Sequence, residues 1–200
     1  MPGQTDLNGA GLVFVTGSDR KREEVERLLN RALERADIDL PEVQHVGLDH
    51  VAAAKALAAW EALGRQRAVI VEDTGLSFEA WSGLPGALVK WFVQTVGVEG
   101  LCRMLADFPD RRATATTVVA VYDGTLRTFR GSIPGSIAES PRGENGFGWD
   151  SIFIPGGSER TFAEMEPSEK DRFSMRRIAF AAMVTALDET AHAAPPPAET

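Results

Sequence analysis

The sequence is poor in cysteine and has no long apolar run, and each of these absences excludes a class of protein. Cys102 is the single cysteine among 200 residues, so neither an intramolecular disulfide nor a metal cage of several cysteines can form. No apolar stretch approaches the roughly 18 residues that a membrane-spanning helix needs. The N-terminal segment MPGQTDLNGA lacks the apolar region of a signal peptide. We therefore expect a soluble, cytoplasmic protein with no membrane partner.

Positive charge is also scarce. The chain has 21 Lys and Arg against 29 Asp and Glu, which gives a net charge of -8 at pH 7. This excess of negative charge argues against a nucleic-acid polymer as the main partner. A single nucleotide remains possible, because its phosphates need only a local cluster of cations or a metal ion. The three histidines lack the spacing of metal ligands, and we assign no role to His45, His50 and His192.

The residues that are present fit one globular domain. With 44% hydrophobic content, 200 residues are enough for a sizeable core. Residues 1–10 and 191–200 are small, polar or proline-rich, and we expect both to be disordered tails. No linker, repeat or low-complexity block interrupts residues 11–190, so we interpret them as a single domain.

Strand-like and helix-like segments alternate along this domain. The sequence predicts strands at 11–18, 40–46 and 68–75, helices at 19–36, 49–63, 86–106 and 168–190, and a hairpin of two strands joined at Asp123-Gly124. This alternation favours an α/β domain with a mixed sheet. Lys21 lies on the apolar stripe of the first helix, where its charge has to be neutralised, and Arg176 lies on the stripe of the last.

TGSDRK, residues 16–21, carries the first candidate site. A strand that passes through a glycine turn into a helix leaves backbone N–H groups free, and these bind anions. Lys21 adds a positive charge for a phosphate. The motif lacks the second glycine and the Lys-Ser/Thr pair of a P-loop. The alternative is that Thr16 or Ser18 is an ordinary helix cap and Lys21 is solvated.

VEDTG, residues 71–75, places two acids at the end of a predicted central strand. Ligands of open α/β sheets bind beyond the carboxyl ends of the strands. Neighbouring side chains point to opposite faces, so Glu72 and Asp73 need not share a site. We favour Asp73, closer to the turn, as an oxygen ligand of Mg²⁺. The alternative is a turn formed by Asp-Thr-Gly without a metal.

GENGFGWDSIF, residues 143–153, combines glycines with large aromatic residues. The rings of Phe147 and Trp149 can stack on a nucleotide base, and the carboxylate of Asp150 can accept hydrogen bonds from the edge of the base. The alternative is a glycine-rich turn whose rings cap the core. The sequence leaves both interpretations open.

SEKDRFSMRR, residues 168–177, places Lys170 and Arg176 at the start of the last predicted helix. A surface helix normally exposes such charges to solvent, and we expect this of Lys170. Solvation fits Arg176 less well, because it lies on the apolar stripe.

The order and spacing of these motifs resemble the inosine/xanthosine triphosphate pyrophosphatase family. The resemblance extends from about residue 12 to 188 and rests on VFVTGSDRKREEVERLL, VEDTGLSFEAWSGLPG, KWF, GFGWD, TFAEM and EKDRFSMRRIA. LPGALVKWF together with FGWD is closer to the eukaryotic branch of this family. The resemblance implies an elongated, two-lobed α/β fold whose mixed sheet is flanked by helices, with the nucleotide in the central cleft. It also implies a homodimer.

The same resemblance implies a role for individual residues. Those expected to bind the triphosphate are Thr16, Gly17, Ser18, Lys21 and Lys55. Glu42 and Asp73 are expected to hold Mg²⁺, and Asp73 also to activate the attacking water. Those expected to form the base pocket and nucleotide contacts are Phe147, Gly148, Trp149, Asp150, Lys170, Met175 and Arg176. The implied reaction is hydrolysis of ITP, dITP or XTP to the monophosphate and pyrophosphate, with Asp73, Lys21 and Lys55 as catalytic residues.

The chain departs from the family pattern at three places. Ser18 replaces an asparagine, Met175 a histidine, and Ser151 the proline usual in bacterial members. These changes bear on base selectivity more than on hydrolysis. Two other functions stay open: the same chemistry on an unusual nucleotide of specialised metabolism, or a catalytically weak nucleotide-binding protein. The presence of Glu42, Lys55 and Asp73 argues against the second, because pure binding does not require an activated water.

Overall fold

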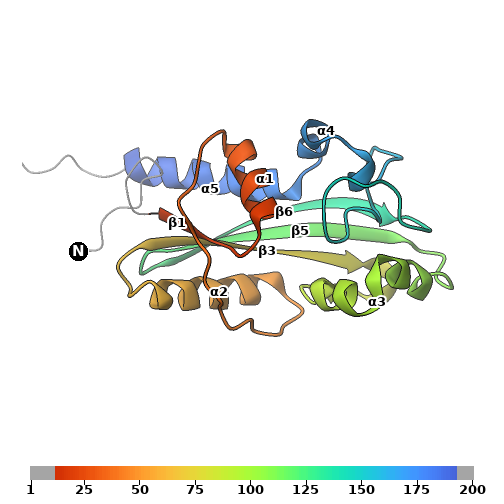
Figure 1. Ribbon diagram of the computed structural model, residues 1–200, viewed down its shortest axis with the longest axis horizontal. Helices are drawn as coiled ribbons and strands as arrows, with labels where there is room; N and C mark the ends of the chain where they lie inside the picture. Colours follow the sequence, from red (N-terminus) through yellow and green to blue (C-terminus); the bar gives the residue numbers. More distant parts are fainter. Residues whose placement is uncertain (1–11, 193–200) are drawn as a thin grey trace, which may run out of the picture.

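The computed structural model describes residues 12–192 and shows an elongated molecule built on one twisted sheet (Figure 1). The helices α1, α4 and α5 lie over one face of the sheet, and α2 and α3 lie over the other. Of the tails predicted at 1–10 and 191–200, only residues 191 and 192 are described, and they continue the last helix. No helix within residues 12–192 is long and apolar enough to cross a membrane.

The sheet is mixed, as the sequence predicts. Its strand order is β2-β1-β3-β5-β6-β7, and β4 pairs with β3. β1 is parallel to β2 and β3, whereas the other pairs are antiparallel. The strands are β1 Leu12–Val15, β2 Arg35–Ala36, β3 Ala68–Phe78, β4 Pro85–Gly86, β5 Arg112–Tyr122, β6 Leu126–Ile137 and β7 Phe153–Pro155. The predicted hairpin at Asp123-Gly124 joins β5 to β6 and is confirmed.

The helices are α1 Asp19–Leu29, α2 Leu48–Ala62, α3 Val89–Met104, α4 Pro167–Arg172 and α5 Met175–His192. The predicted helix at 19–36 is too long. It ends at Leu29 because Asn30 adopts a left-handed conformation with φ of 51° and caps the helix. α3 is also interrupted, since Gly97 has φ of 73° and divides it into two helical pieces.

Two further boundaries differ from the prediction. The strand expected at 40–46 does not form: the segment pairs with no described strand, and its Val43 and Val46 are 50% and 51% exposed. The short strand β2 precedes it instead. The helix expected at 168–190 is divided into α4 and α5. The hydroxyl of Ser174 accepts a hydrogen bond from the Arg177 N–H (3.1 Å), so a new helix starts there.

The core has three parts that follow the alternation of the strands. Ile70 and Phe14 pack with Phe180 under α1 and α5, whereas Val69 and Val71 pack against α2. At the other end of the sheet, a third cluster forms around Leu76, Phe78, Leu101, Phe153 and Phe162. The first two clusters make one lobe of the molecule, and the third makes the other.

Between the lobes, one edge of β3 has no strand beside it. β5 occupies one edge of β3 from Val69 to Phe78. On the other edge, β1 pairs only as far as Ile70, and β4 begins at Leu76. Residues 71–75, which include both acids of the VEDTG motif, therefore border an opening in the sheet. Side chains from either face can meet there.

Candidate active site

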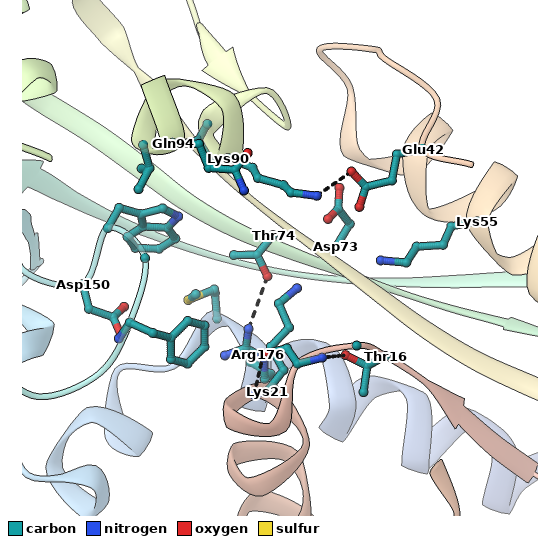
Figure 2. Close-up of a pocket in the computed structure, with 18 of the residues that line it drawn as sticks. Thr16, Lys21, Glu42, Lys55, Asp73, Thr74, Lys90, Gln94, Asp150 and Arg176 are labelled. Atoms are coloured by element: carbon teal, nitrogen blue, oxygen red, sulfur yellow. Dashed lines mark hydrogen bonds and ion pairs between the residues drawn. The ribbon is translucent and has the colours of Figure 1, made fainter. Parts of the chain in front are cut away.

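All of the site residues predicted from the sequence line one cavity of about 410 Å³ at this opening (Figure 2). They come from the turn between β1 and α1, the loop before α2, α2 itself, β3, the loop at 143–150 and the last two helices. Figure 2 shows Asp150 and Gln94 toward one end, and Glu42, Asp73 and Lys55 toward the other. The predicted base and phosphate groups are thus separated along a single cleft.

The turn after β1 is a helix cap, as one of the two sequence interpretations proposes. The Ser18 hydroxyl accepts a hydrogen bond from the Lys21 N–H (3.3 Å), and the Thr16 hydroxyl accepts one from the Ser18 N–H (3.2 Å). The cap does not leave Lys21 in bulk solvent. Its ammonium lies 3.0 Å from a carboxylate oxygen of Glu72, and its side chain is 21% exposed. This pairing neutralises the inward-facing lysine, as predicted.

Two carboxylates and three lysines surround the other end of the cavity. Asp73 and Lys55 are half-buried on the α2 side of the sheet, and Glu42 reaches them from the loop before α2 (Figure 2). Burial raises the pKa of Asp73, although the positive charges of Lys21 and Lys55 act to lower it. Burial and the charge of Lys21 lower the pKa of Lys55. Lys90 lies 2.7 Å from Glu42. Although burial raises the pKa of Glu42, Lys90 lowers it below its usual value.

The donor set at Glu42 and Asp73 fits a magnesium ion that is shared with a ligand. Mg²⁺ is commonly held by one or two carboxylates and completed by substrate phosphates and water. Both carboxylates line the same cavity. No cluster of three or more His, Cys, Asp or Glu that could hold a metal occurs in the described part of the chain. These two acids therefore suit a metal bound together with a nucleotide better than a metal held by protein alone.

Glu72, beside Asp73 in β3, faces the other side of the sheet. It is 2% exposed and receives two hydrogen bonds from Arg176, at 2.7 and 3.2 Å, besides the ammonium of Lys21. Burial alone raises its pKa, but the charges of Arg176 and Lys21 lower that pKa to about 2. Its oxygens are already bonded to cations. Glu72 is therefore placed as their partner and not beside Glu42.

The aromatic loop has features of both interpretations that the sequence leaves open, a wall of the binding pocket and a turn whose rings cap the core. Trp149 is 7% exposed and packs against Phe153 and Phe162, with ring centroids 5.6 and 6.4 Å away. It is thus a core residue, yet it also lines the cavity. Phe147 is half-buried beside the same cavity, and Gly148 between the rings has φ of 63°.

The loop is attached to the rest of the protein by polar contacts. One oxygen of Asp150 accepts hydrogen bonds from the Lys170 ammonium and the Phe147 N–H, both at 2.8 Å. Burial raises the pKa of Asp150. The guanidinium of Arg20 donates to the carbonyl of Gly146 at 2.6 Å. The loop is therefore fixed to α1 and α4.

The cations of the last two helices are both buried. Lys170 was expected to be solvated, and this is wrong: it is 6% exposed and lies between Asp150 and Glu24. Arg176 is 1% exposed and bonds to Glu24 (2.6 Å) as well as to Glu72. Both still line the cavity. Met175, 2% exposed, opens α5 beside them and presents an apolar side chain to the same space.

Several lining residues escaped the sequence analysis. The cavity is also bordered by Thr74, Val89, Lys90, Val93 and Gln94. The last four form one face of α3, with the spacing of a helical stripe. KWF is part of the family resemblance, but a helix stripe of mixed polarity gives no sign by itself that it borders a cavity.

A family model and curated relatives match this chain over most of its length. Residues 12–186 match the model of the Ham1 family. Inosine triphosphate pyrophosphatase 1 of Trypanosoma cruzi is 44% identical over 178 residues, which cover 86% of this chain and 89% of that protein. The dITP/XTP pyrophosphatase of Hyperthermus butylicus is 43% identical over 169 residues, covering 82% and 88% respectively.

Solved structures share the fold. The Ham1 protein of Staphylococcus aureus superposes with a TM-score of 0.76 at 26% identity, covering 89% of this chain and 98% of that chain. A nucleoside-triphosphatase / dITP/XTP pyrophosphatase of Mycobacterium abscessus gives 0.69 at 30% identity, covering 86% and 98%. The same chain path therefore occurs in proteins of both these bacteria.

Proposed function

The chain belongs to the Ham1 family, and from that premise we propose that its cleft hydrolyses non-standard purine nucleoside triphosphates. The substrates are ITP, dITP and XTP, and the products are the nucleoside monophosphate and pyrophosphate. The protein is thus a hydrolase that removes non-standard purine nucleoside triphosphates from the nucleotide pool. The observation that carries the proposal is that the predicted phosphate, metal and base residues all line one cavity.

Asp73 is the group best placed to activate water. It borders the opening in the sheet, and its carboxylate lines the cavity together with Lys55 and Glu42, within reach of a bound triphosphate. In the proposed reaction, Asp73 takes a proton from the water that attacks the α-phosphorus. The bond from this phosphorus to the bridging oxygen breaks, and pyrophosphate leaves.

The lysines act on the phosphates. Lys21 and Lys55 line the same cavity as Asp73 (Figure 2), and in the proposed reaction their positive charges stabilise the negative charge that develops on the leaving pyrophosphate. Together they also align the triphosphate for attack. Mg²⁺, which we propose that Glu42 and Asp73 hold, supplies further neutralisation of the phosphate oxygens when bound. The cluster of cations offsets the net charge of -8 on the whole chain.

The opposite end of the cleft suits a purine. Phe147 and Trp149 offer aromatic surface, and Asp150, Lys170 and Arg176 offer polar groups for the edge of a base. Arg176 makes its described hydrogen bonds to Glu24, Glu72 and Thr74, so its guanidinium is held in one orientation at the cavity wall. A rigid donor of this kind selects bases by what they present to it.

The test is a panel of triphosphates assayed with Mg²⁺. ITP, XTP, GTP and ATP are compared, with pyrophosphate and orthophosphate measured separately. Release of pyrophosphate from ITP or XTP, abolished by a chelator, is the expected result. A mixture of nucleoside diphosphate and orthophosphate would refute attack at the α-phosphorus.

We also propose that two copies associate in the cytoplasm. Val43, Val46, Leu84 and Trp91 are 45–51% exposed. A hydrogen bond from the Ala87 N–H to the Val46 carbonyl joins the two segments that carry them. An exposed apolar surface of this kind supports self-association. The lone, buried Cys102 suits a reducing compartment. Light scattering checks the mass in solution, and Val46→Lys is expected to shift it toward the monomer.

A further inference from the structure

Glu72 is a buried acid that the proposed reaction does not use. It lies next to Asp73 in the strand, but its carboxylate points to the α1 and α5 side of the sheet. One oxygen accepts from Arg176 Nε at 2.7 Å. The other lies 3.0 Å from Lys21 Nζ and 3.2 Å from Arg176 Nη2. A single carboxylate thus joins a cation of the phosphate end to a cation of the base end.

Such a partner restricts the conformations of the Lys21 side chain, so that its ammonium is already in position when a ligand binds. A lysine side chain is a flexible four-carbon stem with a point charge, and it adopts many conformations when free. The side chain of Lys21 is 21% exposed, whereas that of Glu72 is 1% exposed and fixed on both oxygens. The ammonium has three N–H donors, so bonding to Glu72 leaves donors for a phosphate.

We propose that Glu72 is a positioning residue, which holds the Lys21 ammonium at the place where it meets the phosphates of the substrate. The inference rests on the proposed function, because it assumes that Lys21 binds phosphate. Glu72 contributes by ordering Lys21 before the ligand arrives, so the ligand does not have to order it.

Glu24 provides a matched control. It is also a buried acid, 4% exposed, and it bonds to Arg176 at 2.6 Å. Its other described ion pair is to Lys170 and not to Lys21. Glu24→Gln therefore removes one carboxylate from Arg176 and from Lys170, and it leaves the Lys21–Glu72 pair in place. Glu72→Gln removes a carboxylate from Arg176 and from Lys21 together.

The experiment measures inhibition by inorganic pyrophosphate, which has phosphates but no base. In Glu72→Gln we expect its inhibition constant to rise roughly tenfold, the scale of one lost charge-assisted hydrogen bond. In Glu24→Gln we expect a change of less than twofold. The kcat of Glu72→Gln should fall for both ITP and GTP, because Lys21 acts on phosphates, and the ratio between them should change too, because Arg176 also loses a carboxylate. Glu24→Gln should change only the ratio between the two substrates.

Further variants separate positioning from folding. Glu72→Asp keeps the charge but withdraws it by one methylene, and we expect an intermediate rise in the pyrophosphate constant. In a Lys21→Met background, Glu72→Gln should raise that constant no further. Equal effects of Glu72→Gln and Glu24→Gln, or additive effects with Lys21→Met, overturn the positioning role. Those outcomes leave the proposed function intact. The proposed function itself fails if the wild-type protein releases no pyrophosphate from any triphosphate, and the positioning role then fails with it.

Discussion

Glu72 and Asp73 follow each other in β3 and have different roles because successive side chains of a strand point to opposite faces. Glu72 is enclosed by Arg176 and Lys21, whereas Asp73 faces the cavity with Lys55 and Glu42. The environment of each acid, more than its residue type, decides whether it neutralises a cation or activates water.

Asp73→Asn tests the second role. The amide has the same shape but accepts no proton, so we expect kcat to fall about 10²-fold or more, the scale of a lost general base. The thermal unfolding temperature should change little. Steady-state kinetics with ITP and Mg²⁺ measure the effect, and activity near that of the wild type would show that another group activates the water.

Trp149→Ala should affect both folding and binding. The ring packs against Phe153 and Phe162, and removal of a buried tryptophan typically costs about 3–5 kcal/mol. If the ring also stacks on the base, binding weakens by about 1–3 kcal/mol. Thermal unfolding and inhibition by inosine monophosphate measure the two effects. Trp149→Phe, which keeps an aromatic face, should lose less of each. An unchanged inhibition constant in folded Trp149→Ala protein would leave the ring a purely structural role.

Met175 bears on base selectivity. Its thioether is apolar and donates no hydrogen bond, unlike the histidine that the family resemblance implies at this place. One lost hydrogen bond corresponds to about 0.5–1.5 kcal/mol, or up to roughly tenfold in discrimination. We expect a narrow preference for ITP over GTP and ATP, widened by Met175→His and not by Met175→Leu. Ratios of kcat/KM measure it, and strong discrimination by the wild type would assign position 175 to packing.

The sequence identifies residues that carry a local pattern. Thr16 to Lys21 and Asp73 follow strands, and Phe147 to Asp150 stand out as aromatic residues among glycines. The burial of Lys170 was not predicted, and that of Arg176 was indicated only by its place on the apolar stripe of the last predicted helix. Arg176 pairs with Glu24, which is 152 residues away in the chain, and a local sequence pattern cannot predict such a partner.

At the scale of elements, the contact between β6 and α5 fixes the end of the cavity. Gly131 in β6 lies directly beneath the start of α5: a Cβ atom there would lie 2.0 Å from the carbonyl oxygen of Met175 and 2.7 Å from the Ala179 nitrogen. Only a residue without a side chain lets the helix approach this closely. Met175 and Arg176 reach the cavity because of that approach.

Gly131→Ala should therefore displace α5. Overpacking of this kind costs about 1–3 kcal/mol, which corresponds to several degrees in unfolding temperature for a chain of this size. Activity should fall in the fraction that remains folded, since Arg176 moves with the helix. Thr128→Ala, at an exposed position of the same strand, is the control and should change neither quantity. Equal behaviour of the two variants would contradict the close approach.

Element types were predictable where periodicity is strong, and boundaries were not. The apolar runs of β1 and β3 and the stripe of α1 give each element its type. The end of α1 depends on the left-handed Asn30, and the separation of α4 from α5 depends on the cap at Ser174. Each of these helix ends depends on a single residue. The apolar stripe continues past that residue, so a prediction from periodicity misses the boundary.

At the scale of the whole molecule, the buried ion pairs make stability depend on pH. Burial alone raises the pKa of Glu24, but Arg176 and Lys170 lower it below the usual 4.5. The folded protein therefore binds this proton less readily than the unfolded chain. The stabilisation is present above the unfolded pKa, and it is lost as the pH falls through the folded pKa.

Glu24→Gln should accordingly be most destabilising near pH 7, by about 1–3 kcal/mol. The difference from the wild type should shrink below pH 4.5. Urea unfolding of both proteins between pH 7 and pH 3 measures it. A difference that stays constant, or grows, as the pH falls would show that Glu24 is not an ionised partner of Arg176 in the folded protein.

The alternation along β3 also limits how the gene can vary. Val118 and Val119 of β5 face Asp73 and Glu72 in the register of the sheet. An in-frame deletion of one codon between Val69 and Val71 would shift the strand by one residue and move each acid to the other face. Arg176 would lose its partner Glu72, and the cavity would lose the carboxylate of Asp73, in a single event. Every residue of the site would still be encoded. Variants of this gene should therefore carry substitutions in β3 but no single-codon insertions or deletions there.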